Sequence, residues 1–429
     1  MTRTAADSRT ENAIIPTTTE ILGKAIIDLV LRDIGTGPEL LLWTRKKYVT
    51  GQQVTYAGKT YQVPYLHPSI VKATRLATGI SDYGTTQQLI EQLEKLFEKY
   101  IGLFASTAQL LVLWVLSTHF PDSVPSPPCL VISGFDMGLA VRLFLLLKCL
   151  VRRGLVLTEI NRAGFCSLVT PLHPTLLINQ PGLSRKVRAF FRASNFPGLV
   201  VPGGSGVVGD VSGSKAVFVG TDMTSEPWSE ATIHIALLPT RVASLPLLDE
   251  RTQSLIADEF LPKLLLYRLR NVAKVQEAMQ SKDPLHPTGA DMLQACAFDA
   301  PDFAQAVLPL LEAQREDLTL QQKLDPARAI VEVVWTPFHE KVDLSPRKIA
   351  DLMNALLRCR GEFREFSAEE VGWQLRNLGL YRQREAGGMV LRAGRENSRR
   401  IHLLARRFGL DPTAVEDCPD CAEPALVSG

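Results

Sequence analysis

The sequence of 429 residues contains no run of about 18 residues that is apolar and uncharged, which is the length that a membrane-spanning helix needs. The closest candidate, residues 130–151, is interrupted by Asp136, Arg142 and Lys148. The first 20 residues also lack the apolar segment of a signal peptide. We therefore expect a cytoplasmic protein with no membrane partner.

Cysteine is sparse as well. Five of the seven cysteines are scattered singly, and only Cys418 and Cys421 form a pair, in the sequence CPDC. This distribution does not suit a disulfide framework, so we expect reduced thiols. The pair has the spacing of metal ligands, but a zinc site needs two further ligands, and none lies near the pair in sequence. We therefore expect no metal site and no other cofactor.

The sequence also has no large excess of positive or negative charge, since 47 basic and 45 acidic residues leave a net charge of only +2. A polyanionic partner such as DNA would have to be bound by a local concentration of basic residues. The 46% of hydrophobic and 21% of charged residues are ordinary for a globular protein. The length allows two or three domains.

The order of patterns along the chain predicts its organisation. Alternating apolar and polar residues around Gly51 and Gly58 predict a small antiparallel β unit. It is either an accessory module or an extension packed on the next domain. We predict a disordered tail at 1–15, an N-terminal β-rich module at 16–83, an α/β core at 84–245, a helical lid and linker at 246–330, a basic C-terminal domain at 331–410 and a flexible tail at 411–429.

In the predicted core, short apolar segments alternate with helical stretches, as in a parallel sheet with helices on both faces. The fold class is therefore α/β. A glycine-rich stretch at 202–215 is interpreted as a β-hairpin rather than a phosphate cradle, because no helix start follows it. The predicted strands are one just after Pro128 and those within residues 153–160, 173–184, 215–222 and 231–237.

The first strand leads through the glycine turn GFDMG, with Gly134 and Gly138, into an apolar helix. The order of segments from 84 to about 240 resembles the P-loop ATPase domain of primase- or helicase-type replication proteins of prophages and plasmids. The family's loop carries G-x-x-x-x-G-K-[ST]. With Gly134 as the first glycine, Leu139, Ala140 and Val141 replace the second glycine, the phosphate-binding lysine and the magnesium-binding hydroxyl.

The resemblance extends to the second motif, an apolar strand that ends in Asp-Glu in active members. Here TLLINQP places the uncharged amides Asn179 and Gln180 at those positions, where they would not attract Mg²⁺. Thr221 or Asp222 would occupy the sensor position. Glu230 and Ala231 stand where relatives place an arginine finger. The resemblance thus implies a degenerate nucleotide site with no catalytic residue, and we expect neither ATP nor Mg²⁺ to bind.

Two alternatives remain open for this region. Strand, glycine turn and helix also occur in any buried βαβ unit. The protein could otherwise be an active but unconventional NTPase or helicase subunit in DNA replication that uses residues such as Lys215 or Arg241.

The C-terminal region predicts a helix capped by Ser367 and Glu370, a hairpin turning at Gly387 and Gly388, and a closing helix. This order resembles a winged helix. The segment 376–407 contains nine arginines but only two glutamates. Arginine binds phosphate bidentately, so the region is a candidate DNA interface. The candidate residues are Arg382, Arg384, Arg392, Arg399, Arg400, Arg406 and Arg407.

The same arginines could instead form a solvated face or bind an acidic protein. A homo-oligomer is also possible, because rings are common in the family that the core resembles. The sequence as a whole favours a catalytically inactive P-loop ATPase-like scaffold of mobile-element origin that associates with DNA or a protein. A winged-helix DNA-binding replication or regulatory factor is the other interpretation.

Overall fold

The computed structural model describes residues 14–410, apart from 33–34, 36, 46, 125–126, 161–170, 183–186, 188–199, 203–207, 211, 221–231, 239–244, 281–288, 381 and 386–387, together with residues 418 and 421. The chain divides into two compact units, residues 1–314 and 315–429. The boundary falls within helix α9 (Pro301–Lys323). In the described part, no helix has both the length and the apolarity to cross a bilayer.

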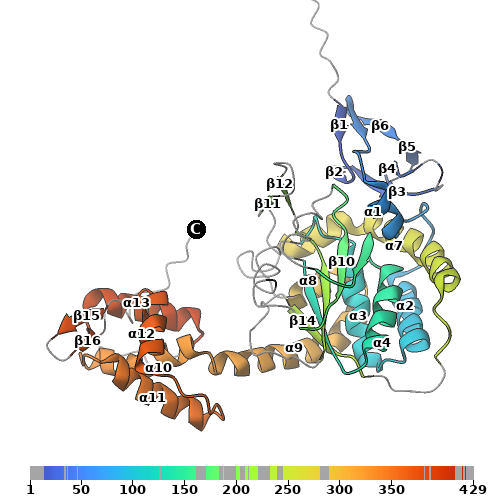
Figure 1. Cartoon of the computed structure of the whole chain (residues 1–429). Coiled ribbons are helices and arrows are strands. Elements are labelled where there is room, and N and C mark those ends of the chain that lie inside the picture. The colour runs from blue at the N-terminus through green and yellow to red at the C-terminus, as the bar shows by residue number, and fades with distance from the viewer. Residues whose placement is uncertain are drawn as a thin grey trace, which may run out of the picture. The chain divides into compact units, whose positions relative to one another are not determined.

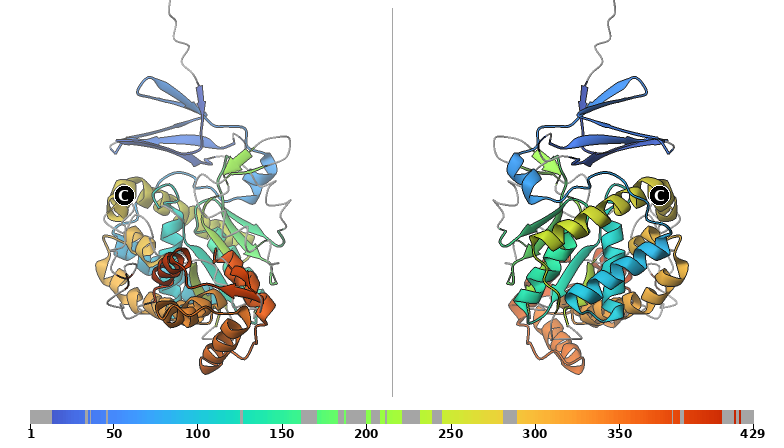
Figure 2. Two further views of the ribbon diagram at one scale, coloured as in Figure 1. Left: turned by 90° about the vertical axis from the view of Figure 1, so that its left-hand side faces the viewer. Right: turned by 90° about the vertical axis from the view of Figure 1, so that its right-hand side faces the viewer.

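The N-terminal strands form two small sheets, coloured blue in Figure 2. Their pairing is antiparallel as predicted, except that β1 and β7 run parallel. One sheet has the order β1-β7-β6 and the other the order β2-β3-β4-β5. The elements are β1 (Ile14–Pro16), β2 (Glu20–Leu22), β3 (Ala25–Val30), β4 (Glu39–Trp43), β5 (Tyr48–Gly51), β6 (Gln53–Tyr56), β7 (Lys59–Gln62) and the short helix α1 (Pro68–Ala73).

A buried ionic cluster connects these strands to the rest of the first unit. Asp28 of β3 is only 2% exposed. Its carboxylate accepts hydrogen bonds from Arg152 at 3.1 Å, Arg153 at 2.6 Å and Arg268 at 2.8 Å. Arg268 also pairs with Asp122 at 2.5 Å. Burial raises the pKa of Asp28, but the three guanidinium groups outweigh burial and hold this pKa far below its usual range.

Because Arg152 and Arg153 follow helix α4 (Met137–Lys148) and Arg268 lies in helix α7 (Glu250–Gln280), this cluster fixes the N-terminal strands to the α/β core. Apolar contacts do the same, since Ile26 and Val30 belong to the large core that also contains the helices. These contacts join the N-terminal strands to the α/β core within the first unit.

The core of the first unit is a five-stranded sheet, and all its strands are parallel, as predicted (Figure 1). Residues alternate between its two faces. Leu130 and Ile132 enter the large core with the helices, whereas Val131 enters a smaller core on the opposite face. The strand order is β14 (Thr232–Ala236), β8 (Cys129–Ser133), β13 (Lys215–Gly220), β10 (Thr175–Asn179) and β9 (Gly154–Leu157). The predicted hairpin pairs β11 (Val200–Pro202) with β12 (Val208–Asp210).

Helix α2 (Thr86–Ile101) starts and ends where the sequence supplies caps. Thr85 and Gln88 form a capping box at the start of α2, and Gly102 ends this helix in the left-handed conformation. Helix α3 is apolar nearly all round and mostly buried. The helices are α2 (Thr86–Ile101), α3 (Ala105–Thr118), α4 (Met137–Lys148), α7 (Glu250–Gln280), α8 (Gly289–Cys296) and the first part of α9.

The second unit has its own apolar core around Ile349, Val371 and Ile401. Ser367 and Glu370 form the predicted capping box. A bridge between Leu344 and Leu391 adds a third strand segment beside the hairpin. The elements are α10 (Pro326–His339), α11 (Pro346–Cys359), α12 (Ala368–Asn377), β15 (Arg382–Glu385), β16 (Gly388–Leu391) and α13 (Arg395–Arg407).

Candidate functional site

The carboxyl edge of the parallel sheet is where α/β proteins bind ligands. Strand β8 ends there at Ser133, and helix α4 already begins at Met137. Asp136 caps the helix, because its Oδ1 accepts the backbone N–H of Leu139 at 2.9 Å. A carboxylate of the chain itself therefore lies at the helix end that would attract a phosphate.

The loop at this edge is shorter than the spacing of a phosphate-binding loop predicts. Only residues 134–136 lie between strand and helix, so Leu139, Ala140 and Val141 form part of the first helical turns. Leu139 is 7% exposed and Ala140 is 1% exposed, and both pack in the large core. The positions that the motif assigns to the second glycine and the lysine therefore have a packing role, and only Val141 is exposed.

Local packing explains why glycine occupies positions 134 and 138 of the turn. A Cβ on Gly134 would lie 3.1 Å from the Cβ of Leu237 and 3.2 Å from its carbonyl oxygen, so close packing against the residue after β14 favours glycine there. A Cβ on Gly138 would lie 3.2 Å from Oδ1 of the capping Asp136. The presence of glycine at these two positions is therefore explained without a bound phosphate.

Asn179 and Gln180 lie at the carboxyl end of β10, as predicted. Strand β13 lies between β8 and β10, so Asn179 and Gly134 share one edge of the sheet but are two strands, or about 10 Å, apart. Gln180 Oε1 accepts the backbone N–H of Ile160 at 2.6 Å. The buried Oδ1 of Asn179 has no hydrogen-bond partner in the described part of the chain. Thr221, Asp222, Glu230 and Ala231 lie outside the described residues.

Of the residues suggested for an unconventional NTPase, Lys215 does not lie at this edge. Lys215 begins β13, at the opposite end of the strand from Gly134's edge, and is 1% exposed. Its Nζ donates to the carbonyl oxygen of Gly213 at 3.0 Å. Arg241 lies outside the described residues.

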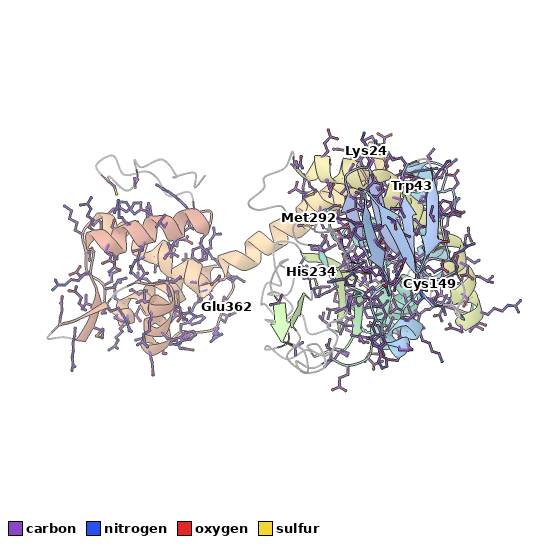
Figure 3. All side chains as sticks on the ribbon, turned by 90° about the horizontal axis from the view of Figure 1, so that it is seen from above. Lys24, Trp43, Cys149, His234, Met292 and Glu362 are labelled. Atoms are coloured by element: carbon purple, nitrogen blue, oxygen red, sulfur yellow. The ribbon has the colours of Figure 1, made fainter. Side chains whose placement is uncertain are left out.

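A separate pocket of about 400 Å³ lies between the N-terminal strands and α7. Lys24 and Trp43, both labelled in Figure 3, line it together with Arg270 and Lys274. Arg270 also pairs with the exposed Asp82 at 3.0 Å. The pocket is a basic cavity large enough for a small molecule, and neither composition nor spacing indicated it.

The predicted DNA-binding arginines are not equivalent. Arg392 pairs with Glu385 at 2.9 Å, and Arg400 pairs with Glu396 at 2.8 Å and donates to the carbonyl of Gly379. These two guanidinium groups already serve contacts within the unit. Arg382 is half-buried, close enough to α12 that a Cβ on Gly372 would meet its guanidinium group.

Three exposed arginines lie on one face of helix α13. Arg395, Arg399 and Arg406 lie at positions i, i+4 and i+11, which place them within about 40° of one another around the helix. All three are exposed, and so is Arg384 on the hairpin. We refer to Arg395, Arg399 and Arg406 as the arginine stripe. The side chain of Arg407 lies outside the described residues.

Near this helix, the structure brings together four metal-ligating side chains that the sequence does not connect. They are His339, His402, Cys418 and Cys421, and their ligand atoms all lie within 4.8 Å of one another. The C-x-x-C spacing marks the two cysteines, but the histidines are 79 and 16 residues before Cys418. Neither histidine belongs to a short motif, and the one available signal is that they are the only histidines after residue 315.

Comparison with known proteins adds little. No family model matches this chain, and no curated protein matches it either. Among solved structures, the A form apo structure of the NrS-1 C-terminal region is similar to it at 9% identity and a TM-score of 0.37, over 86% of this chain and 97% of that chain. A TM-score this low supports no inference about fold or function, so a function has to be argued from the residues of this chain.

Proposed function

We propose that the first unit is a P-loop ATPase-like scaffold that does not hydrolyse nucleotides, and that the second unit is a winged-helix-like domain that attaches the protein to DNA. The observation that carries the first part is the capping of α4 by Asp136. Its carboxylate accepts the N–H of Leu139, so an incoming phosphate would meet a negative charge on an amide that is already bonded.

The positions of the two amides support the same proposal. Asn179 and Gln180 follow the strand that would carry the magnesium-binding carboxylates, and both lack the charge that the ion needs. Gln180 instead holds the backbone of Ile160. Without the lysine, the hydroxyl and the carboxylates, the several kcal/mol that metal and lysine contribute to phosphoryl transfer are missing.

Calorimetric titration of the full chain with Mg-ATP tests this part of the proposal. We expect neither measurable heat of binding nor phosphate release above background. Asp136→Ser is a matched variant, because serine keeps the cap but removes the charge. Turnover in the natural sequence that is lost on Gly134→Val or Asn179→Ala would refute the proposal and favour the unconventional NTPase.

The arginine stripe carries the DNA-binding part. Eleven residues separate Arg395 from Arg406, a rise of about 16 Å, along which a duplex presents roughly ten phosphates. Helix α12 is less suited to this role, because Glu369 and Glu370 stand in its first turn and would repel phosphates, whereas the first turn of α13 has only Glu396, which pairs with Arg400. We therefore place the contact on α13 and on Arg384 of the hairpin rather than on α12.

Fluorescence anisotropy with a labelled duplex at several salt concentrations tests this contact. Neutralising the stripe with Arg395→Gln, Arg399→Gln and Arg406→Gln should weaken binding and make the slope of log K against log salt shallower by about 2 to 3. Arg358→Gln is the control, because Arg358 is exposed on α11 and pairs with Glu365. Binding that is indifferent to salt, or equally weakened by the control, would contradict the proposal and favour an acidic protein partner.

A further inference from the structure

The side chains of His339, His402, Cys418 and Cys421 form a compact group in the second unit. His339 is the last residue of α10, and His402 lies in the middle of α13. The N–H of Cys421 donates to the carbonyl of Cys418 at 3.1 Å. Both sulfur atoms lie beside the histidines, and the C-x-x-C spacing is typical of zinc ligands.

Both imidazole rings are oriented as metal ligands usually are. Nδ1 of His339 lies 2.9 Å from the carbonyl oxygen of Trp335, and Nδ1 of His402 lies 2.7 Å from that of Ser398. An acceptor at this distance keeps the proton on Nδ1 and leaves the Nε2 lone pair available. The ring of Trp335 packs against both imidazoles, with centroid distances of 4.5 and 4.6 Å, and holds them in place.

The distances between the ligand atoms suit a single ion. Cys421 Sγ lies 3.3 Å from His339 Nε2 and 3.2 Å from His402 Nε2, and Cys418 Sγ lies 3.4 Å from His402 Nε2. A tetrahedral zinc with ordinary bond lengths separates a sulfur and a nitrogen ligand by about 3.6 Å. A small outward movement of the ligands would accommodate the ion.

We propose that His339, His402, Cys418 and Cys421 bind one structural Zn²⁺. Two thiolates and two neutral imidazoles neutralise the ion, and two soft sulfur ligands favour zinc over magnesium or calcium. Because the chain fills all four tetrahedral positions, no position is left for a water or a substrate, so the site is structural rather than catalytic. Binding releases the two thiol protons to solvent.

The ion would have a local mechanical effect. It would join α10 and α13 to Cys418 and Cys421. His402 also stands between Arg399 and Arg406 in sequence, so the ion would fix the helix that carries the arginine stripe. This inference does not depend on DNA binding, since the metal can be measured in isolation.

Metal content of the full chain, purified without chelators, provides the direct test. We expect about one zinc per chain, and less than about 0.1 after Cys421→Ser or His402→Gln. Cys359→Ser is the matched control, because Cys359 is an exposed cysteine of the same unit and should keep the zinc. Cobalt substitution should give the visible absorption of a tetrahedral ion with two thiolates. Iron in place of zinc, or octahedral cobalt spectra, would overturn the assignment.

A second measurement avoids variants that fail to fold. In Cys359→Ser, a thiol reagent should modify two additional cysteines only after a strong chelator is added, and peptide mapping should identify them as Cys418 and Cys421. The same two thiols reacting at full rate before the chelator would overturn the proposal. A disulfide between them in the freshly purified protein, with no bound metal, would overturn it as well.

Discussion

Substituting Asp28 by asparagine should destabilise the first unit more than any exposed charge change. Asp28 is 2% exposed, and three buried guanidinium groups point at its carboxylate. In the variant, Arg152 and Arg153 would have no acidic partner in the described cluster, and Arg268 would keep only Asp122. Breaking a buried ion pair from one side costs about 3–5 kcal/mol, a large share of a typical stability of about 5–15 kcal/mol.

Scanning calorimetry and urea unfolding monitored by circular dichroism measure this loss. The transition of the first unit should fall by roughly 5–8 °C, whereas that of the second unit should not move. Asp82→Asn is the matched control, because Asp82 pairs with Arg270 on the surface, where such pairs contribute about 0–1 kcal/mol. If the two variants lose similar stability, below about 1 kcal/mol, the ionic cluster does not hold the N-terminal strands to the core.

Two further predictions concern titration and helix capping. Burial lowers the pKa of His119 from 6.5 to about 3, while its Nε2 lies 2.9 Å from the carbonyl of Leu150. As pH falls below 6.5, the unfolded chain therefore gains a proton that the folded chain does not, and stability should fall by up to about 1.4 kcal/mol per pH unit toward pH 3. In urea unfolding at a series of pH values, His119→Gln should show a shallower decline, and an unchanged slope would contradict this reasoning. Ser367→Ala should destabilise the second unit by about 1 kcal/mol through loss of the α12 cap, seen as a lower melting transition, and Ser367→Thr should restore most of it.

Periodicity and capping residues were enough to predict several elements. The five apolar segments became a parallel sheet, and Ser367 starts a helix as its capping box predicts. Such signals are local, because a cap or an apolar face is defined within a few residues. The position of Asn179 and Gln180 at a strand end was predictable for the same reason.

The length of the loop after β8 was not predictable from the motif spacing. Aligning Gly134 with a phosphate-binding loop assumes a longer loop, but Asp136 can cap a helix and so starts α4 at Met137. Asp136 is therefore the residue that shortens the loop. The capping aspartate was a local signal in the sequence, but the prediction followed the spacing of the motif instead.

The pairing of charges and ligands over long separations was beyond the sequence. Asp28 and Arg268 are 240 residues apart, and His339 and Cys421 are 82 apart. No periodic pattern connects such residues, because their proximity depends on how the whole unit folds. Surface charge can be counted in a sequence, but only the helix geometry shows that the members of the arginine stripe share one face of α13.

The cap on α4 also bears on how this edge of the sheet responds to the cell. When a bound phosphate completes the end of a helix, the stability of that end rises and falls with ligand concentration. Here Asp136 supplies the anion covalently, at a fixed effective concentration, to the N–H of Leu139. The stability of this helix end should therefore not depend on the concentration of nucleotide in the cell.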